Sequence, residues 1–358
     1  MNNKLSHSSV TKYTDCSKAW ELHYKKGYRG NLHSSALLFG TALDKALETF
    51  LKTKDEDQTK KMFMDTWTEQ KLNGVSTQLI SATNIVYANS DFDYEVLEQL
   101  SGLGDDLPSK EQVDKLYELK DTVGYDNLPE ARKKELNFIN WHVMRIKGLL
   151  MVEEAIKQIK NNVTEVLGTQ VKVELANSEG DSIIGYADAV VKWKGYDAPI
   201  ILDFKTSSKM YEDNAVITSP QLSLYVHGLS SDFGHTRHAG FFVLNKHIRK
   251  NKIKICSKCG FDGTGGRHKT CSNIIEGERC EGEWNEKLNP SIFTQIIINE
   301  IPEKLEEIVI ENMNMVNSAI KTGIFPRNLQ SCIKPYGKCA FYEICHKDDY
   351  SQVIKKEE

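Results

Sequence analysis

The stretch IILDFKTS, residues Ile200–Ser207, decides the fold. An apolar run leads into Asp203 and Lys205, two opposite charges separated by Phe204. Side chains two apart on a strand share a face, so Asp203 and Lys205 point the same way and Phe204 points into packing. A surface ion pair of this kind contributes about 0–1 kcal/mol. The stretch therefore has two interpretations, an ordinary strand end or a strand that holds a metal and a water.

A second strand pattern precedes this one. SIIGYADAVVKW, residues Ser182–Trp193, carries Asp188, and the turn after it predicts an antiparallel pair that brings Asp188 near Asp203. Glu174 sits one strand further back. Two carboxylates with a lysine beside them make a hard oxygen site for Mg²⁺ or Mn²⁺. Such a metal lowers the pKa of a bound water and neutralises charge on a scissile phosphate, and Lys205 would orient or deprotonate that water.

A helix pattern follows the strand that carries Asp203. SPQLSLYVHGLSS starts with Pro220, which the first turn of a helix accepts. Gln221 and Tyr225 are four residues apart on this helix, so they share a face. That face adds two polar side chains to the predicted site.

The remaining patterns predict an α/β architecture. Helical, charge-rich sequence precedes a period-two pattern that begins at Val171, and residues 289–323 read as a long helix or helix pair that Gly323 ends. We divide the chain into N-terminal helices (1–51), a helical insertion (52–165), a core (166–245), a four-cysteine insert (246–289) and C-terminal helices with further cysteines (290–358).

Four of the eight cysteines are close together in the sequence. Their stretch is rich in Gly, Ser, Thr and charge, and it has too few apolar residues for a core of its own. A tetrahedral thiolate Zn²⁺ site supplies order, because structural zinc contributes about 10–16 kcal/mol to folding. Disulfides are disfavoured in a chain without a secretion signal. The spacing therefore predicts a zinc site made by Cys256, Cys259, Cys271 and Cys280.

The other four cysteines are split along the chain. Cys332, Cys339 and Cys345 are clustered, and Cys16 is the one cysteine left to complete a four-thiolate centre. Closing this set joins segments that are far apart in sequence. Either Zn²⁺ or a [4Fe–4S] cluster suits such a set, and spacing alone does not choose between them.

The composition of the chain limits the class of protein to which it can belong. With 358 residues, 27% charged and 40% hydrophobic, the chain reads as a soluble globular protein of one elaborated domain or two to three smaller units. A polar N-terminus and short apolar runs predict no membrane partner and a cytoplasmic location. The net charge of −4 gives no global signal for nucleic acid, but a nuclease needs only a groove that attracts phosphates. The basic residues 245–254 read as a solvated edge strand or loop, or as a stretch that contributes some contact to nucleic acid beside the four-cysteine insert, which braces the long loop.

The order of these motifs resembles the PD-(D/E)XK phosphodiesterases, in the RecB-like branch that includes CRISPR-associated and phage exonucleases with an iron–sulfur cluster. LSHSSVTKYTDCSKAWELHY resembles the opening helix of that branch, GYADAVV and LDFKTS its two acidic motifs, and QLSLY its Q-x3-Y motif. CIKPYGKCAFYEIC resembles its terminal cysteine trio. The matching residues cover roughly 1–51, 170–245 and 325–346. The resemblance implies a restriction-endonuclease-like core, a mixed central sheet flanked by helices, here with a helical insertion and a small zinc module.

The resemblance also implies roles for single residues. The metal (Mg²⁺ or Mn²⁺) would be held by Asp188, Asp203 and the main-chain carbonyl of Phe204, with assistance from Glu174. The catalytic lysine would be Lys205, and the side chains that shape the site or contact DNA would be Gln221 and Tyr225. The ligands of a [4Fe–4S] cluster, a structural clamp near the DNA path, would be Cys16, Cys332, Cys339 and Cys345.

One position departs from the family pattern. The early helix of the family reads G-x3-His, with the histidine as a metal ligand, whereas GTALDK here has Asp44 at that position. Aspartate is a harder ligand that suits Mg²⁺ or Mn²⁺. Asp44 is therefore either a replacement ligand or a solvent-facing helix residue.

The activity that the resemblance implies is that of a metal-dependent DNA exonuclease acting on single-stranded or processed duplex ends. Similar proteins act in recombination, repair, phage replication or CRISPR spacer capture, so proteins of those processes are the expected partners besides DNA. The expected location is the cytoplasm of a bacterium or of a phage-infected host cell. Two alternatives stay open: a nuclease-like module that binds DNA without cutting it, and an endonuclease or RNA-directed enzyme of the same fold.

Overall fold

The protein is described here by a computed structural model, which covers residues 4–30, 35–68, 94, 98, 108–124, 127–176, 181–264, 266, 268–334 and 337–356. A six-stranded sheet forms its centre, with strand order β1-β4-β5-β6-β11 and with β3 also paired to β4. β1 lies parallel to β4 and β5 parallel to β6, while the other pairs are antiparallel. This sheet confirms the predicted α/β architecture with a mixed central sheet. Its strands are β1 (Lys4–Ser6), β3 (Val163–Ala176), β4 (Ser182–Trp193), β5 (Ile200–Ser207), β6 (His238–Asn245) and β11 (Thr294–Glu300).

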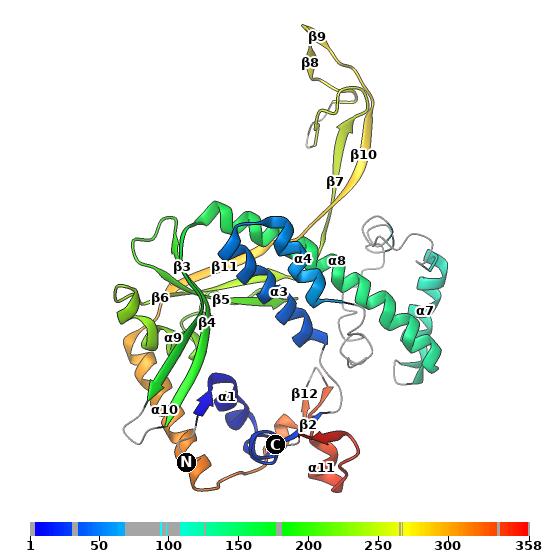
Figure 1. Ribbon diagram of the computed structural model, residues 1–358. Coiled ribbons are helices and arrows are strands. Elements are labelled where there is room, and N and C mark those ends of the chain that lie inside the picture. The colour runs from blue at the N-terminus through cyan, green and yellow to red at the C-terminus, as the bar shows by residue number, and fades with distance from the viewer. Residues whose placement is uncertain are drawn as a thin grey trace.

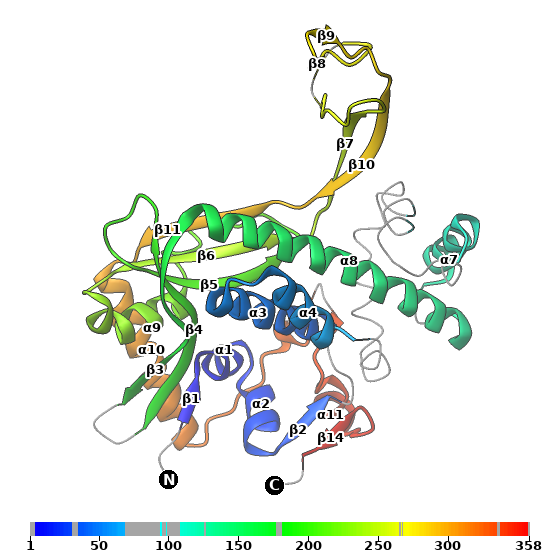
Figure 2. The same cartoon turned by 45° about the horizontal axis from the view of Figure 1, so that its top comes forward.

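Helices cover both faces of the sheet (Figures 1 and 2). One face packs against α3 (Ser35–Thr53), α4 (Glu56–Thr66) and α8 (Glu130–Asn162), and the other against α1 (His7–Asp15), α9 (Pro220–Leu229) and α10 (Glu303–Lys321). In β5, Leu202 and Phe204 belong to the first core and Ile201 to the second. A strand buried on both faces is held rigidly, so β5 presents its polar end in a fixed direction.

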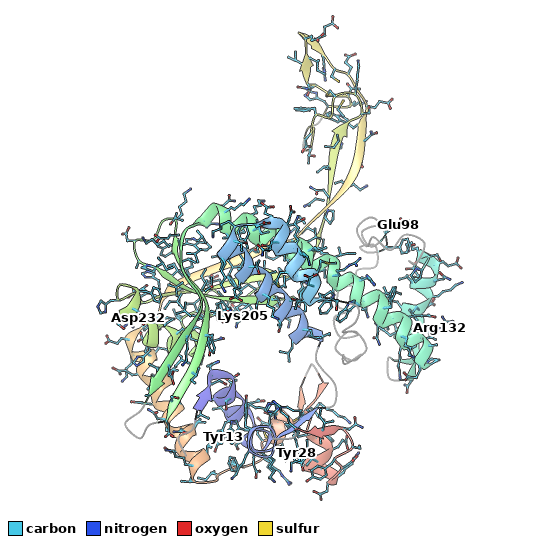
Figure 3. All side chains as sticks on the ribbon, in the orientation of Figure 1. Tyr13, Tyr28, Glu98, Arg132, Lys205 and Asp232 are labelled. Atoms are coloured by element: carbon cyan, nitrogen blue, oxygen red, sulfur yellow. The ribbon has the colours of Figure 1, made fainter. Side chains whose placement is uncertain are left out.

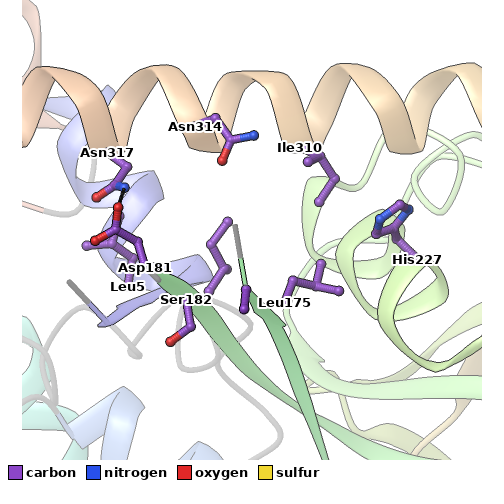
Figure 4. A pocket seen from close by; sticks show the side chains of 10 residues that line it. Leu5, Leu175, Asp181, Ser182, His227, Ile310, Asn314 and Asn317 are labelled. Carbon is purple, nitrogen blue, oxygen red and sulfur yellow. Dashed lines mark hydrogen bonds between the residues drawn. The ribbon is translucent and has the colours of Figure 1, made fainter. Parts of the chain in front are cut away.

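Close contacts attach these helices to each other and to the sheet. Gly148 of α8 lies against the ring of Phe63 in α4, where a Cβ would come within 1.9 Å of Phe63 Cζ. α10 is fastened to the start of β4, because Asn317 Nδ2 donates to Asp181 Oδ2 at 2.8 Å beside a small pocket of about 160 Å³ (Figure 4). These contacts fix the layers on either side of β5.

The N-terminal and C-terminal segments lie together below the sheet (Figure 2). β2 (Tyr28–Gly30) pairs antiparallel with β14 (Val353–Lys355). Apolar side chains of Ala19, Leu22, Phe341 and Ile344 form a small core between them. We call this part the terminal unit, and its other elements are α2 (Ser17–Trp20), the π-helical turn Glu21–Lys25, β12 (Ile333–Lys334), β13 (Gly337–Lys338) and α11 (Tyr342–Lys347).

Two further parts extend from the sheet and its helices. β7 (Arg249–Cys256) and β10 (Trp284–Ser291) form a separate antiparallel ladder that projects as an arm, with β8 (Ile274–Ile275) and β9 (Glu278–Arg279) near its tip (Figure 1). The basic stretch 245–254 therefore runs into one strand of this arm. α7 (Lys110–Val123) packs against α8 to form a helical lobe.

The predicted helix over residues 289–323 is wrong for residues 289–302. β10 runs to Ser291 and β11 occupies Thr294–Glu300, so the helix α10 begins only at Glu303. Residues 296–298 are three consecutive isoleucines, and β-branched side chains favour a strand that pairs with the exposed edge of β6. Gly323 does follow the helix end, with φ of +77°. The strand pattern also begins earlier than Val171, because β3 starts at Val163.

Candidate active site

The candidate site lies where β4 and β5 separate. β4 pairs with β1 through Ser182–Ile184 and with β5 through Ala189–Val191. Asp188 therefore lies on β4 between the segment that pairs with β1 and the segment that pairs with β5. Asp188 Oδ2 accepts a hydrogen bond of 2.7 Å from the backbone N–H of Phe204. The carboxylate thus takes the place of a ladder hydrogen bond at the point where the ladder stops.

Asp203 is the most buried acid of the group, at 2% exposure. Its Oδ1 accepts a hydrogen bond of 2.9 Å from Gln221 Nε2, and its Oδ2 forms an ion pair with Lys205 Nζ. Lys205 Nζ also donates to Gln221 Oε1 at 3.1 Å, and Gln221 Nε2 donates to the Tyr225 hydroxyl at 2.8 Å. One glutamine therefore holds the acid, the lysine and the tyrosine in one network.

The pKa shifts show that Asp203 acts on the two other carboxylates. Burial raises the pKa of Asp188 to about 7, and the negative charge of Asp203 adds to the shift. Burial and Asp203 together raise the pKa of Asp44 to about 6. Burial also raises the pKa of Asp203, although Lys205 opposes the shift. α3 thus brings Asp44 into the same electrostatic environment as the two strand residues, and Asp44 is not an ordinary solvent-facing residue.

This donor set fits a divalent cation. Three acids face one lysine, so the ionised group has an excess of negative charge in a desolvated place. Asp203 Oδ2 is buried, and among the described residues its partner is Lys205. Hard carboxylate oxygens are the ligands that Mg²⁺ and Mn²⁺ prefer.

The main-chain carbonyl of Phe204 points to the same edge of β5 as its N–H group. In an extended strand the N–H and C=O of one residue point in the same direction. Because the Phe204 N–H meets Asp188, its carbonyl oxygen also points toward the space between β4 and β5. The ring of Phe204 packs edge-on against Phe242 on the opposite side from Asp203 and Lys205, as the strand alternation predicts.

The structure does not bring Glu174 into this group. Glu174 is paired in register with Ile184, four residues before Asp188, and it forms an ion pair with Lys172. Gln170 lies beside Asp188 instead, and its Nε2 donates to Asp188 Oδ1 at 3.3 Å. Thr169 pairs with Ala189 and Val171 with Ala187, in one unbroken register from Gly168 to Ala176, which puts Gln170 at the level of Asp188.

Two other neighbours of Lys205 were not singled out in the sequence. Burial and the charge of Lys205 lower the pKa of His7, the first residue of α1, to about 4. Burial raises the pKa of Tyr211, and Lys205 and Asp203 both act on it. Gln295 of β11 holds the backbone of Tyr211 through two hydrogen bonds of 2.8 and 2.9 Å. His7 stands inside the LSHSS motif, whereas nothing in the pattern around Tyr211 marks it.

The first cysteine set converges near the tip of the arm. Cys256 Sγ lies 3.6 Å from Cys280 Sγ, and Cys259 Sγ lies 3.6 Å from Cys271 Sγ. In the part of the chain that the structure describes, no other group of three or more His, Cys, Asp or Glu has all ligand atoms within 4.8 Å of one another. The four cysteines can hold a metal. The oxygens of Asp44, Asp188 and Asp203 are spaced more widely, so their side chains must close in to share one cation.

The second cysteine set surrounds one cavity in the terminal unit. The cavity has a volume of about 260 Å³, and its lining includes Cys16, Cys332, Cys339 and Cys345. Burial raises the pKa of the Cys339 and Cys345 thiols. These sulfurs are also more widely spaced than those of the arm. The structure thus brings together the split set across more than 300 residues of sequence.

The sequence matches the PD-(D/E)XK nuclease superfamily over residues 4–88 and 95–346, so the chain belongs to this superfamily. Nucleases of this kind use divalent metal ions, and the fold implies DNA as substrate. No curated protein matches the sequence. None of the helices described is long and apolar enough to cross a membrane.

Two solved structures are similar to the chain. One, from Eubacterium rectale, is described as a candidate exonuclease; it is 13% identical, with 99% of this chain and 91% of that chain covered and a TM-score of 0.35. The other is the protein named SSO0001, which is 14% identical, with 69% of this chain and 93% of that chain covered and a TM-score of 0.25.

The raised carboxyl pKa values predict a pH-dependent stability in protein dialysed free of added divalent cations. Since the folded-state pKa of Asp188 lies above that of an unfolded chain, its stabilising effect is complete below about pH 4 and is lost as the pH rises through about 7. Asp188→Asn should therefore raise the melting temperature at pH 7.5 and leave it nearly unchanged at pH 4.

The matched control for this experiment is Asp65→Asn, at an acid that is 59% exposed and paired with Lys61. Its melting temperature should follow that of the parent at both pH values. Parallel curves of melting temperature against pH for the parent and Asp188→Asn would contradict the electrostatic account of the site.

Proposed function

We propose that the chain is a divalent-metal-dependent deoxyribonuclease that works as an exonuclease on single-stranded or processed DNA ends. The observation that supports this function best is the network of Asp203, Lys205 and Gln221 beside Asp188. It combines a hard oxygen site with a positioned lysine, and hydrolysis of a phosphodiester needs both. The network is built on a strand that is buried on both faces and therefore keeps its geometry.

The metal ligands we propose are Asp44, Asp188, Asp203 and the carbonyl of Phe204. When bound, Mg²⁺ or Mn²⁺ neutralises charge on the scissile phosphate and lowers the pKa of water. Asp44 supplies a hard oxygen where the family has a histidine, which favours these two cations. Glu174 has no part in this site, because it is paired with Lys172 away from Asp188.

Lys205 acts from a fixed position. Burial is the largest single influence and lowers its pKa, but the charge of Asp203, the hydrogen bond to Asp203 and the charges of Asp188 and Tyr211 together outweigh it, so the pKa is raised overall. The side chain is therefore an ammonium at neutral pH. In that form it donates hydrogen bonds, so we assign it to orienting the attacking water and stabilising charge on the phosphate oxygens. Gln221 fixes its direction by accepting one of its hydrogen bonds.

Tyr225 supports Gln221 from the same helix face. Burial raises the pKa of its hydroxyl to about 12, so it stays neutral, and the oxygen accepts from Gln221 Nε2. The helix face that Gln221 and Tyr225 share thus acts as one positioning element. We assign both residues to shaping the site.

The two cysteine sets differ in the cofactor that suits them. A tetrahedral zinc with Zn–S bonds of about 2.3 Å keeps its sulfurs about 3.8 Å apart. The 3.6 Å separations in the arm support Zn²⁺ there. The four cysteines around the terminal cavity are more widely spaced and suit a larger cofactor than a single zinc ion. Their spacing supports a [4Fe–4S] cluster and the RecB-like branch. For such an enzyme we propose a cytoplasmic role in recombination, repair, phage DNA metabolism or CRISPR adaptation.

The cleavage test uses one single-stranded DNA in two forms, linear with a labelled end and circular, with Mg²⁺ or Mn²⁺. The linear form should be degraded from its ends and the circle should stay intact. Lys205→Ala should lower the rate by about 10²–10³-fold, because it removes a positioned hydrogen-bond donor to the attacking water and the phosphate oxygens. Lys192→Ala, at an exposed lysine of neighbouring β4, is the matched control and should cleave like the parent.

Cleavage of the circle would show an endonuclease instead. If neither form is cut with either metal, while Lys205→Ala binds the DNA as well as the parent, the chain is a DNA-binding module.

Metal content tests the two cofactor assignments. Protein purified without oxygen should be brown and contain about four iron ions and one zinc ion. Cys339→Ser should lose the iron and the colour but keep the zinc, and Cys271→Ser should do the reverse. The two variants serve as controls for each other, and colourless parent protein with two zinc ions would reject the iron–sulfur assignment.

A further inference from the structure

A basic pocket of about 510 Å³ lies in the terminal unit, where β2 pairs with β14. Figure 3 shows Tyr28, one of its residues, on this unit and apart from Lys205 of the sheet. Residues from both distant segments of the chain build it. They are Tyr24, Lys25, Lys26, Gly27, Tyr28, Arg29, Lys355 and Lys356.

Among the described residues, few acids compensate the charges of the basic pocket. Five of its residues are cationic, and Glu21 lies 3.5 Å from one of them, Lys26. Glu21 is shared with Lys18. Among the described residues, no carboxylate lies within ion-pair distance of Lys355 or Lys356. Like charges collected around a concave surface create a positive potential that a polyanion relieves.

A series of aromatic rings in contact with one another extends to the basic pocket. Trp20 stacks on Phe325 with centroids 5.7 Å apart and planes 7° from parallel, and Tyr24 continues from Trp20 at 5.6 Å. Tyr24 also packs edge-on against His23, with centroids 4.6 Å apart; it is 41% exposed and lines the pocket. The exposed part of this ring offers a surface on which a nucleobase can stack.

We propose that the basic pocket is a binding site for single-stranded DNA, outside the candidate active site. The phosphates of the strand pair with Lys25, Lys26, Arg29, Lys355 and Lys356, and one base stacks on Tyr24. A duplex keeps its bases paired and stacked within the helix, so the combination of cations with an exposed ring selects an unpaired strand. The inference rests on the proposed function for its choice of DNA as the polyanion.

The test measures equilibrium binding of a fluorescent single-stranded oligonucleotide to the full chain, without added divalent cation, over a series of salt concentrations. For single strands the slope of log K against log salt is about −0.7 per phosphate contact. Lys355→Gln/Lys356→Gln should therefore make the slope less steep by about 1.4 and weaken binding at low salt. Tyr24→Leu should weaken binding about tenfold without changing the slope, because stacking releases no counterions.

The charge-matched control is Lys110→Gln/Lys115→Gln, on α7 of the helical lobe, where both lysines are more than half exposed. It should bind with the affinity and slope of the parent. The proposal is overturned if the parent does not bind the strand, if the pocket variants bind like the parent, or if the control loses as much affinity as they do.

Hydrolysis of bis(p-nitrophenyl) phosphate separates this proposal from the proposed function. This small phosphodiester can occupy the active site without reaching the basic pocket, so the pocket variants should hydrolyse it at the parental rate. If the parent hydrolyses neither it nor DNA but shows the predicted binding losses, the pocket stands and the nuclease assignment fails. A loss of this hydrolysis in the pocket variants would instead overturn the separate pocket.

Discussion

The carboxylates of Asp44, Asp188 and Asp203 lie together in a desolvated place beside a single lysine, Lys205. The rest of the structure holds these four side chains in position. Like charges raise one another's pKa there, as Asp203 does for Asp44 and Asp188. Such a group is stable only if the backbone holds it or a cation neutralises it. The Phe204 N–H holds Asp188, and Gln221 and Lys205 hold Asp203, so each strand acid has a fixed oxygen and a direction.

The scaffold explains why this arrangement is attainable. β5 is buried between two helical layers and runs parallel to β6, so its polar end cannot shift relative to β4. α9 supplies Gln221 from one face of the sheet, and α3 supplies Asp44 from the other. The terminal unit and the arm are separate additions, each with its own four cysteines, and neither contributes to the carboxylate group.

The sequence predicted the parts of the site that depend on local geometry. Alternation along one strand puts Asp203 and Lys205 on the same face, and a four-residue helix spacing does the same for Gln221 and Tyr225; the structure has both. Glu174 does not lie beside Asp188, because the β3–β4 register pairs it with Ile184 and puts Gln170 beside Asp188, and residue alternation does not specify the register between two strands. Residues 294–300 form a strand because they pair with the edge of β6, and this pairing depends on tertiary contacts that the local sequence does not specify. The effects of Lys205 on His7 and Tyr211 likewise depend on distant segments packing together.

Mn²⁺ binding, followed by the paramagnetic resonance signal of the free ion, tests most directly whether these three acids form one cation site. The measurement compares the parent with Asp44→Asn, Asp188→Asn, Asp203→Asn and the control Glu174→Gln. Each of the three aspartate variants should bind Mn²⁺ at least about tenfold more weakly, because each loses a charged oxygen ligand. Glu174→Gln should bind like the parent. Parental affinity in Asp44→Asn, or weakened binding in Glu174→Gln, would contradict the account.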